Sequence, residues 1–145
     1  MIGQNAHGNE PSHHAAWLYA FTASPWKGHA LVDRIARSFY KDSPHGLIGN
    51  DDCGQMSAWL IFATLGFYPV TAGQGNYMTG LPLVKKARIR LATGTLTILA
   101  KTPATFKRQL AHRVALKIDG NLVDTQMPLA HEALLKARTL DFSVA

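Results

Sequence analysis

The sequence predicts an α+β fold in which helices come first and antiparallel strands follow. Apolar residues recur at helical spacing before Pro69 and alternate with polar residues after it. The stretch between residues 69 and 82 separates the two patterns, because it is rich in glycine and proline. We therefore expect a helical unit over residues 1–70 and a β-rich segment over residues 71–145.

Three helices are expected in the first half. They cover residues 13–23, 26–41 and 55–65, and each places large apolar side chains on one face. Pro25 separates the first two helices, since proline disfavours helical backbone in the residue before it. Gly66 follows the third helix and is a good C-terminal stop, because glycine readily adopts a left-handed backbone.

Strands are expected in the second half, at residues 87–91, 96–100, 114–118 and 139–144. The turn residues Asp119-Gly120-Asn121 follow the third of these and predict a hairpin. Residues 131–136 fit both a helical turn and a loop, and the sequence pattern does not decide between them.

Composition excludes several classes of protein. The chain has 145 residues, of which 47% are hydrophobic, so it is long enough to bury a modest core. The single cysteine, Cys53, excludes an internal disulfide framework and a zinc site made of several cysteines. No apolar run approaches the roughly 18 residues of a membrane span. The first residues lack the basic and apolar segments of a signal peptide.

The net charge of +6 is concentrated in the second half, where eleven of the 15 lysines and arginines follow residue 66. Lys86, Arg88 and Arg90 alternate with apolar residues, as they do on the solvent face of a strand. No aromatic side chains are interleaved to stack on bases. We therefore expect a solvated face here and no nucleic-acid partner.

Two polar loops at helix entrances are the candidates for chemistry. The first reads His7-Gly8-Asn9-Glu10-Pro11-Ser12-His13-His14, and the second reads Gly49-Asn50-Asp51-Asp52-Cys53-Gly54-Gln55. Helix entrances offer free N–H groups and a positive dipole end, which suit ligands rich in oxygen. Structural roles remain open for both loops, since Asp51 or Asp52 can cap the third helix and each histidine can be a core or surface residue.

The loops also allow several catalytic and metal-binding interpretations. Glu10 and Asp52 together can supply the acid and base of glycoside hydrolysis. His13 and His14 point about 100° apart on a helix, which disfavours a shared zinc ion, whereas oxygen ligands without a cysteine cluster suit calcium. Cys53 follows two acids, which raise rather than lower the pKa of a thiol, so it is a poor candidate nucleophile.

Four blocks of sequence resemble glycoside hydrolase family 92, the calcium-dependent exo-acting α-mannosidases. They are the two loops just quoted, with their continuations Ala15-Ala16-Trp17-Leu18-Tyr19 and Met56-Ser57-Ala58-Trp59, together with Ser24-Pro25-Trp26-Lys27 and Leu65-Gly66-Phe67-Tyr68-Pro69-Val70. The resemblance is strong over residues 3–84 and looser after them. It implies part of an (α/α)6 toroid followed by strands of a β-sandwich, and inverting hydrolysis of α-mannosides, most often α-1,2-linked.

The resemblance also implies roles for individual residues. Asp52 matches the acid that acts as, or beside, the general base, and Asp51 is its catalytic neighbour. Asn9 and Glu10 match the motif that lines the sugar and the calcium ion, and His13 and His14 belong to the same motif and are expected to bind substrate. Asn50 stands where some members carry a further aspartate.

Members of this family are several times longer than 145 residues, and their proton-donating glutamate precedes the motif that contains Glu10. We therefore expect a C-terminal piece of such an enzyme, which is inactive by itself. A mannose-containing glycan is its expected substrate, and a separately encoded N-terminal half is a candidate partner. The alternatives are a non-catalytic carbohydrate-binding or complementing module, and a translated remnant without function. Relatives are typically periplasmic or secreted, and the sequence leaves the compartment of this chain open.

Overall fold

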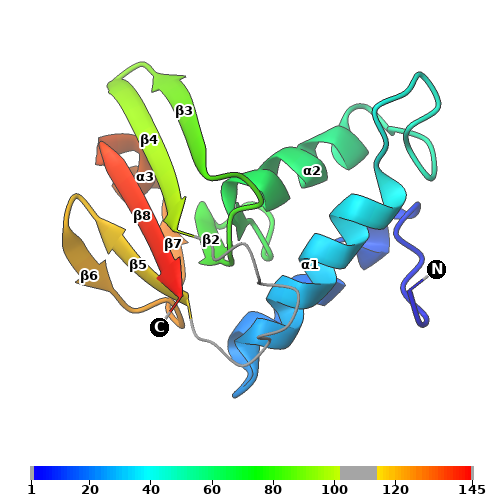
Figure 1. Ribbon diagram of the computed structural model, residues 1–145, viewed down its shortest axis with the longest axis horizontal. Coiled ribbons are helices and arrows are strands. Elements are labelled where there is room, and N and C mark those ends of the chain that lie inside the picture. Colours follow the sequence, from blue (N-terminus) through cyan, green and yellow to red (C-terminus); the bar gives the residue numbers. More distant parts are fainter. Residues whose placement is uncertain (1, 102–113, 145) are drawn as a thin grey trace.

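The computed structural model describes residues 2–101 and 114–144 and confirms the α+β prediction (Figure 1). The helical segments of the first half are η1 (Glu10–Ser12), η2 (Ala15–Phe21), α1 (Pro25–Phe39) and α2 (Gln55–Leu65). In Figure 1, α1 and the N-terminal segment lie at one side and the larger sheet at the other, with α2 reaching between them. None of the described helices is both long and apolar enough to span a bilayer.

The helix that was predicted over residues 13–23 is a 3₁₀ helix, η2, rather than an α-helix. It packs against α1, and a Cβ atom placed on Gly28 of α1 would lie 2.7 Å from the carbonyl oxygen of Ala16. The missing side chain of Gly28 therefore permits this close approach. Thr22 ends η2, because its hydroxyl donates to the Tyr19 carbonyl and accepts a hydrogen bond from the Ser24 N–H.

A five-stranded sheet forms most of the second half. Its strands are β3 (Lys86–Leu91), β4 (Gly94–Lys101), β5 (Val114–Ile118), β6 (Asn121–Val123) and β8 (Thr139–Val144), in the order β3-β4-β8-β5-β6. The strands predicted from alternation are all present. The β4–β8 pair is parallel while the other pairs are antiparallel, so the sheet is mixed.

Three short strands form a second sheet, in the order β1 (Phe67–Tyr68), β2 (Asn76–Thr79) and β7 (Leu129–Ala130). Strands of two to four residues are too short to show an alternating pattern, so the sequence did not predict them. Helix α3 (His131–Lys136) directly follows β7 and resolves the choice left open for that segment. Because β1 and β2 pair across residue 70, the division at that position stays a prediction.

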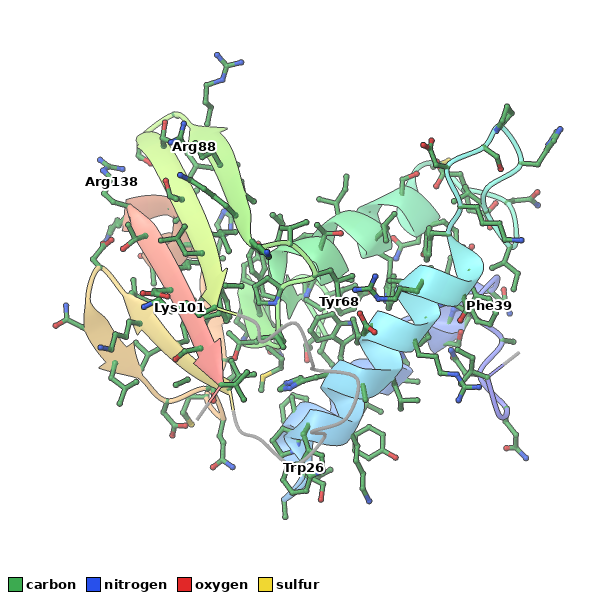
Figure 2. The ribbon with its side chains drawn as sticks, viewed as in Figure 1. Trp26, Phe39, Tyr68, Arg88, Lys101 and Arg138 are labelled. Carbon is green, nitrogen blue, oxygen red and sulfur yellow. The ribbon has the colours of Figure 1, made fainter. Side chains whose placement is uncertain are left out.

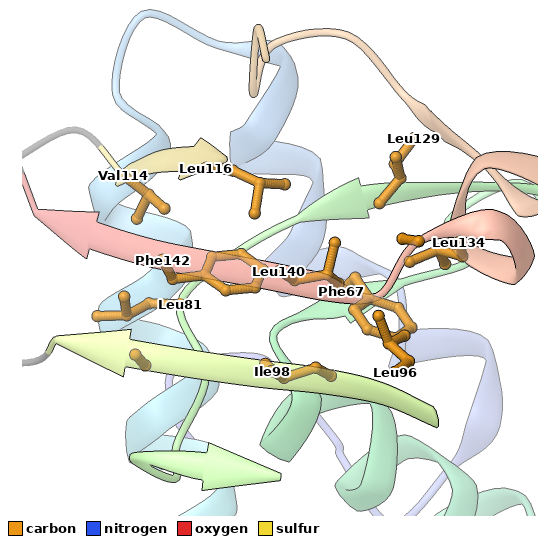
Figure 3. Close-up of a cluster of buried hydrophobic side chains, with 12 residues drawn as sticks. Phe67, Leu81, Leu96, Ile98, Val114, Leu116, Leu129, Leu134, Leu140 and Phe142 are labelled. Carbon is orange, nitrogen blue, oxygen red and sulfur yellow. The ribbon is translucent and has the colours of Figure 1, made fainter. Parts of the chain in front are cut away.

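Two hydrophobic clusters stabilise the fold. The sheet cluster is built on the inward side chains of the larger sheet (Figure 3) and comprises Phe67, Leu81, Leu96, Ile98, Ala100, Val114, Leu116, Leu129, Leu134, Ala137, Leu140 and Phe142. The helix cluster comprises Ala16, Trp17, Val32, Ile35, Ala36, Trp59, Ala63 and Tyr68. Trp17 and Trp59 are buried in it, which agrees with a packing role for both. On β3, Lys86, Arg88 and Arg90 are exposed as predicted.

Gly66 ends α2 as predicted and joins the helix to the strands. Its backbone is left-handed, with φ of +86°, and its N–H donates to the carbonyls of Phe62 and Ala63. A Cβ at Gly66 would lie 2.6 Å from the Pro82 ring, so only glycine fits without a shift of that ring. Gly73 has a similar φ of +82°, but a Cβ there would meet nothing within 4 Å.

We predict that Gly66→Ala destabilises the chain more than Gly73→Ala. Both variants place alanine in a left-handed backbone, at a cost of about 1–2 kcal/mol. Only Gly66→Ala also clashes with Pro82, and overpacking of this kind adds about 1–3 kcal/mol. Urea denaturation of the two variants measures the difference, and equal losses of unfolding free energy would contradict the prediction.

Candidate active site

The two polar loops meet where the backbones of Gly8 and Gly49 come together. A Cβ atom on Gly49 would lie 2.7 Å from the carbonyl oxygen of Gly8 and 3.1 Å from its Cα atom. A side chain at position 49 would push the loops apart, because these neighbours are backbone atoms that cannot move aside cheaply. This contact therefore holds the loop of Glu10 beside the loop of Asp52.

Glu10 and Asp52 are brought together at this junction. A side-chain hydrogen bond between them shifts the pKa values of both carboxyl groups, in opposite directions. The hydrogen bond with Glu10 and the repulsion from its charge raise the pKa of Asp52, and Asp51 adds to this repulsion. The pKa of Glu10 is lowered, chiefly by its hydrogen bond with Asp52. Two carboxyl groups that interact in this way titrate as a unit.

The turn before α2 holds Asp52 at the surface in an uncommon backbone conformation. Asp52, Cys53 and Gly54 all have positive φ angles, of +44°, +57° and +93°. Left-handed backbone in residues other than glycine is costly, by about 1–3 kcal/mol each, and such residues cluster at functional sites. Aspartate tolerates this region better than most residues. Cys53 is exposed and forms no disulfide within the described residues.

Asp51 has a different role from that of its neighbour. Its carboxylate accepts hydrogen bonds from the backbone N–H of Ser57 at 2.8 Å and from the Ser57 hydroxyl at 3.1 Å. Ser57 lies in the first turn of α2, where N–H groups have no partner within the helix. Asp51 thus satisfies a free N–H at the helix start, as a capping residue does. This geometry favours the structural role over the catalytic one, and its catalytic role stays a prediction.

The three histidines of the first loop are not equivalent. His7 and His13 are 1% and 2% exposed, whereas His14 is exposed. The His13 Nε2 atom lies 3.0 Å from the His7 carbonyl oxygen, which only accepts hydrogen bonds, so Nε2 carries the proton. His13 Nδ1 is then the acceptor in a neutral ring, and Gln55 Nε2 donates to it at 3.2 Å. Both ring nitrogens of His13 are therefore occupied.

His7 is enclosed by aromatic rings. Its ring centroid lies 4.3 Å from that of Trp59, and it stacks on Phe39, which ends α1 in Figure 2. Burial lowers the pKa of His7 to about 4, and the electrostatic influence of the neighbouring His13 imidazole adds to this shift. The Tyr40 hydroxyl lies 2.7 Å from His7 Nε2 and donates to the Met56 carbonyl at 3.1 Å, so His7 Nε2 is the donor in their bond.

Sequence reasoning did not place Tyr40 at the site, and it considered Tyr68 only as an aromatic platform for a sugar. Tyr40 lies within the range predicted for the second helix, residues 26–41. Burial is the main cause that raises the pKa of Tyr40, and electrostatic repulsion from Tyr68 and Asp51 raises it further. Burial also raises the pKa of Tyr68, which lies near the middle of the molecule in Figure 2, and a hydrogen bond with the Gln55 side chain opposes that rise. A tyrosine at the end of a helical stripe carries no local sign of these contacts.

Two polar residues, Asn9 and Asn50, precede the acids in the two loops. Asn9 precedes η1 and is exposed, and its carbonyl accepts from the Ser12 hydroxyl at 2.9 Å. Asn50 is exposed beside Asp51.

Glu10 Oε1 is shielded from solvent and receives no hydrogen bond from a donor in residues 2–101 or 114–144. No group of three or more His, Cys, Asp or Glu side chains suited to a metal occurs within these ranges.

Searches of solved structures give matches over nearly the whole chain. A family GH92 α-mannosidase of Bacteroides thetaiotaomicron is 34% identical with a TM-score of 0.88, and the match covers 100% of this chain and 19% of that one. The same enzyme in complex with mannoimidazole gives a TM-score of 0.87 at 34% identity, over 99% and 19% of the two chains. An inverting mannosidase of that family and organism is 33% identical with a TM-score of 0.82, again over 99% and 19%.

Among curated proteins, an uncharacterized secreted glycosidase of Arthroderma benhamiae is 27% identical over 138 residues, which are 94% of this chain and 18% of that protein. The chain thus spans about a fifth of the length of the proteins that it resembles. The sequence pattern of the glycosyl hydrolase family 92 catalytic domain matches residues 1–145. The resemblance noted in the sequence is confirmed, and the chain belongs to glycosyl hydrolase family 92.

Proposed function

We propose that this chain supplies the general base and part of the mannose-binding site of a calcium-dependent, inverting exo-α-mannosidase that removes terminal α-1,2-linked mannose. The contact between Glu10 and Asp52 is the observation that carries the proposal. Two acids at one point on the surface suit a polyhydroxylated sugar, whose hydroxyl groups donate to carboxylates. The mannoimidazole complex of a similar enzyme supports a mannose-containing substrate.

Asp52 is the proposed general base and takes a proton from the water that attacks the anomeric carbon. It is exposed, whereas the Asp51 carboxylate is engaged by Ser57. Glu10 is not suited to be the general acid opposite Asp52. The two carboxyl groups of an inverting enzyme stand about 6.5–9.5 Å apart to admit sugar and water, and hydrogen-bonded carboxyl groups are closer than that. Glu10 therefore binds sugar or metal in this proposal, and the acid lies elsewhere in the enzyme.

Asn9 and His14 are the proposed sugar contacts beside the acids. Both are exposed and flank η1, the short helix that begins with Glu10. His13 also belongs to the predicted substrate-binding set, but its engaged ring nitrogens make it better suited to holding the loop than to reaching a ligand.

The residues at the junction suit calcium in type. Glu10 and Asp52 offer carboxylate oxygens and Asn9 an amide oxygen, and Ca²⁺ binds six to eight oxygen ligands. Glu10 Oε1, which is shielded and receives no donor in the described ranges, is an oxygen that a cation would satisfy. When bound, the ion would supply positive charge that offsets the repulsion between the acids. Further oxygens would have to come from backbone, sugar or other parts of the enzyme.

In a full-length family member, asparagine at the position of Asp52 is expected to lower kcat by about 10²–10⁴ with little change in KM. This is the usual contribution of a general base, and asparagine keeps the size and backbone tolerance of aspartate. Initial rates on α-1,2-mannobiose measure both constants. The matched control is asparagine at the position of Asp42, which is exposed outside the two acid loops. An increase in KM with kcat intact would contradict the role.

Calcium binding to the chain is expected to strengthen as pH rises through the raised pKa of Asp52. Below that pKa a proton occupies the acid pair, and the ion must displace it. Calorimetry with CaCl₂ at several pH values, in buffers of different protonation enthalpy, measures affinity and proton release. Glu10→Gln removes one charged ligand and should weaken binding about tenfold or more. Affinity that is independent of both pH and Glu10 would exclude this calcium site.

The chain alone is expected to release no mannose, because it spans only about a fifth of the length of the enzymes it matches. Its helical half exposes Leu18, Phe21 and Ile61, at 45%, 57% and 59% of their surface, which suits contact with further protein. The test is release of mannose from α-1,2-mannobiose with calcium, with and without a separately produced remainder of the family catalytic region. Activity of the chain by itself would contradict the expectation. Calorimetric binding of mannose without restored activity would favour the alternative, a non-catalytic carbohydrate-binding module.

A further inference from the structure

A second link joins the two acid-bearing loops, at the end opposite the glycine contact. Gln55 Nε2 donates to His13 Nδ1 at 3.2 Å. His13 comes three residues after Glu10, and Gln55 comes three residues after Asp52. Each end of this hydrogen bond therefore stands the same distance along the chain from one of the two acids.

The link is rigid at the His13 end. The ring is 2% exposed, and its Nε2 atom is engaged by the His7 carbonyl oxygen at 3.0 Å. The backbone carbonyl of His13 accepts a hydrogen bond from Trp59 Nε1 at 2.9 Å, and Trp59 is itself fully buried in α2. The ring therefore has one orientation and presents Nδ1 as an acceptor.

The link is equally defined at the Gln55 end. Gln55 is the first residue of α2, and its backbone N–H bonds the carbonyl of Asp52 at 3.2 Å. Its side chain must supply a donor to a neutral imidazole nitrogen, which an amide does and an ionised carboxylate cannot. The residue is therefore held at both ends, by its backbone at the start of α2 and by its amide on the His13 ring.

We propose that Gln55 is a positioning residue whose hydrogen bond to His13 sets the separation of the Glu10 and Asp52 carboxyl groups. The Gly8–Gly49 contact brings the loops together at one end, and the Gln55–His13 bond prevents them from pivoting apart at the other. Its importance for hydrolysis rests on the proposed function, since the acid pair is the working part of that site. The geometric claim does not depend on activity.

The first test measures the distance between the two carboxyl carbons in the purified chain, by solid-state NMR with ¹³C-labelled aspartate and glutamate. Gln55→Met keeps the length of the side chain and removes the donor, and it should lengthen the separation by about 1 Å or more, a displacement that matters in active sites. Thr125→Val is the control, because it removes one hydrogen bond, from Thr125 to the Val114 carbonyl, in the sheet half. The control should leave the carboxyl separation unchanged.

An unchanged carboxyl separation in folded Gln55→Met overturns the proposal, whatever the fate of the proposed function. Circular dichroism establishes that the variant is folded. Gln55→Ala serves as a second variant if Gln55→Met does not fold, since alanine is the best helix former and adds no bulk. If Thr125→Val lengthened the carboxyl separation by the same amount, the effect would reflect a general loss of stability, and this would also overturn the proposal.

The second test separates positioning from stability by kinetics in a full-length family member. Methionine at the position of Gln55 should lower kcat about 10–10²-fold, with KM little changed, because a misplacement of 1 Å costs about that much. In a background that already carries asparagine at the position of Asp52, the same substitution should have no further effect. The same loss of kcat in both backgrounds would show that Gln55 does not act through Asp52, and would overturn the proposal.

Discussion

The close approach of the Gly8 and Gly49 backbones is the constraint on which the rest of the site depends. The two residues are 41 positions apart in the sequence, and a single Cβ atom on Gly49 would meet the Gly8 carbonyl at 2.7 Å. Without this contact the loops of Glu10 and Asp52 would be separate helix entrances, each with its own acid. With it, the two acids lie together at the surface and repel each other when both are ionised. A proton, a cation or a sugar hydroxyl group that binds between them relieves this repulsion.

The two adjacent acids of the second loop have different roles at the start of α2. Asp51 turns inward and satisfies the Ser57 N–H, while the left-handed backbone of Asp52 and Cys53 turns the second carboxylate outward. One residue thus stabilises the start of α2, and the next is free for chemistry. The buried histidines connect the first loop to α2. His13 is hydrogen-bonded to Gln55, the first residue of that helix, and His7 packs on Trp59.

Much of the fold was predictable from the sequence. The third helix has the limits that its pattern indicated, at Gln55–Leu65, and Gly66 ends it as expected. Helical and alternating patterns are local properties, so they survive in a single sequence. The parallel pairing of β4 with β8 was not predictable, because β5, β6, β7 and α3 lie between the two strands in the sequence and no local signal encodes which strand β8 pairs with. The short strands β1, β2 and β7 were not predicted, because two to four residues are too few to show an alternating pattern.

The sequence by itself determined the order of the main helices and of the longer strands, the family, and the two loops that hold the candidate residues. Only the tertiary structure decided that Asp51 is bonded to Ser57 while Asp52 meets Glu10, and that His13 is buried while His14 is exposed. Adjacent residues of the same type look alike in a sequence. They differ in the folded chain because their contacts are made by other parts of the chain. Asp51 meets Ser57, six positions further on, whereas His13 meets Gln55 across 42 positions.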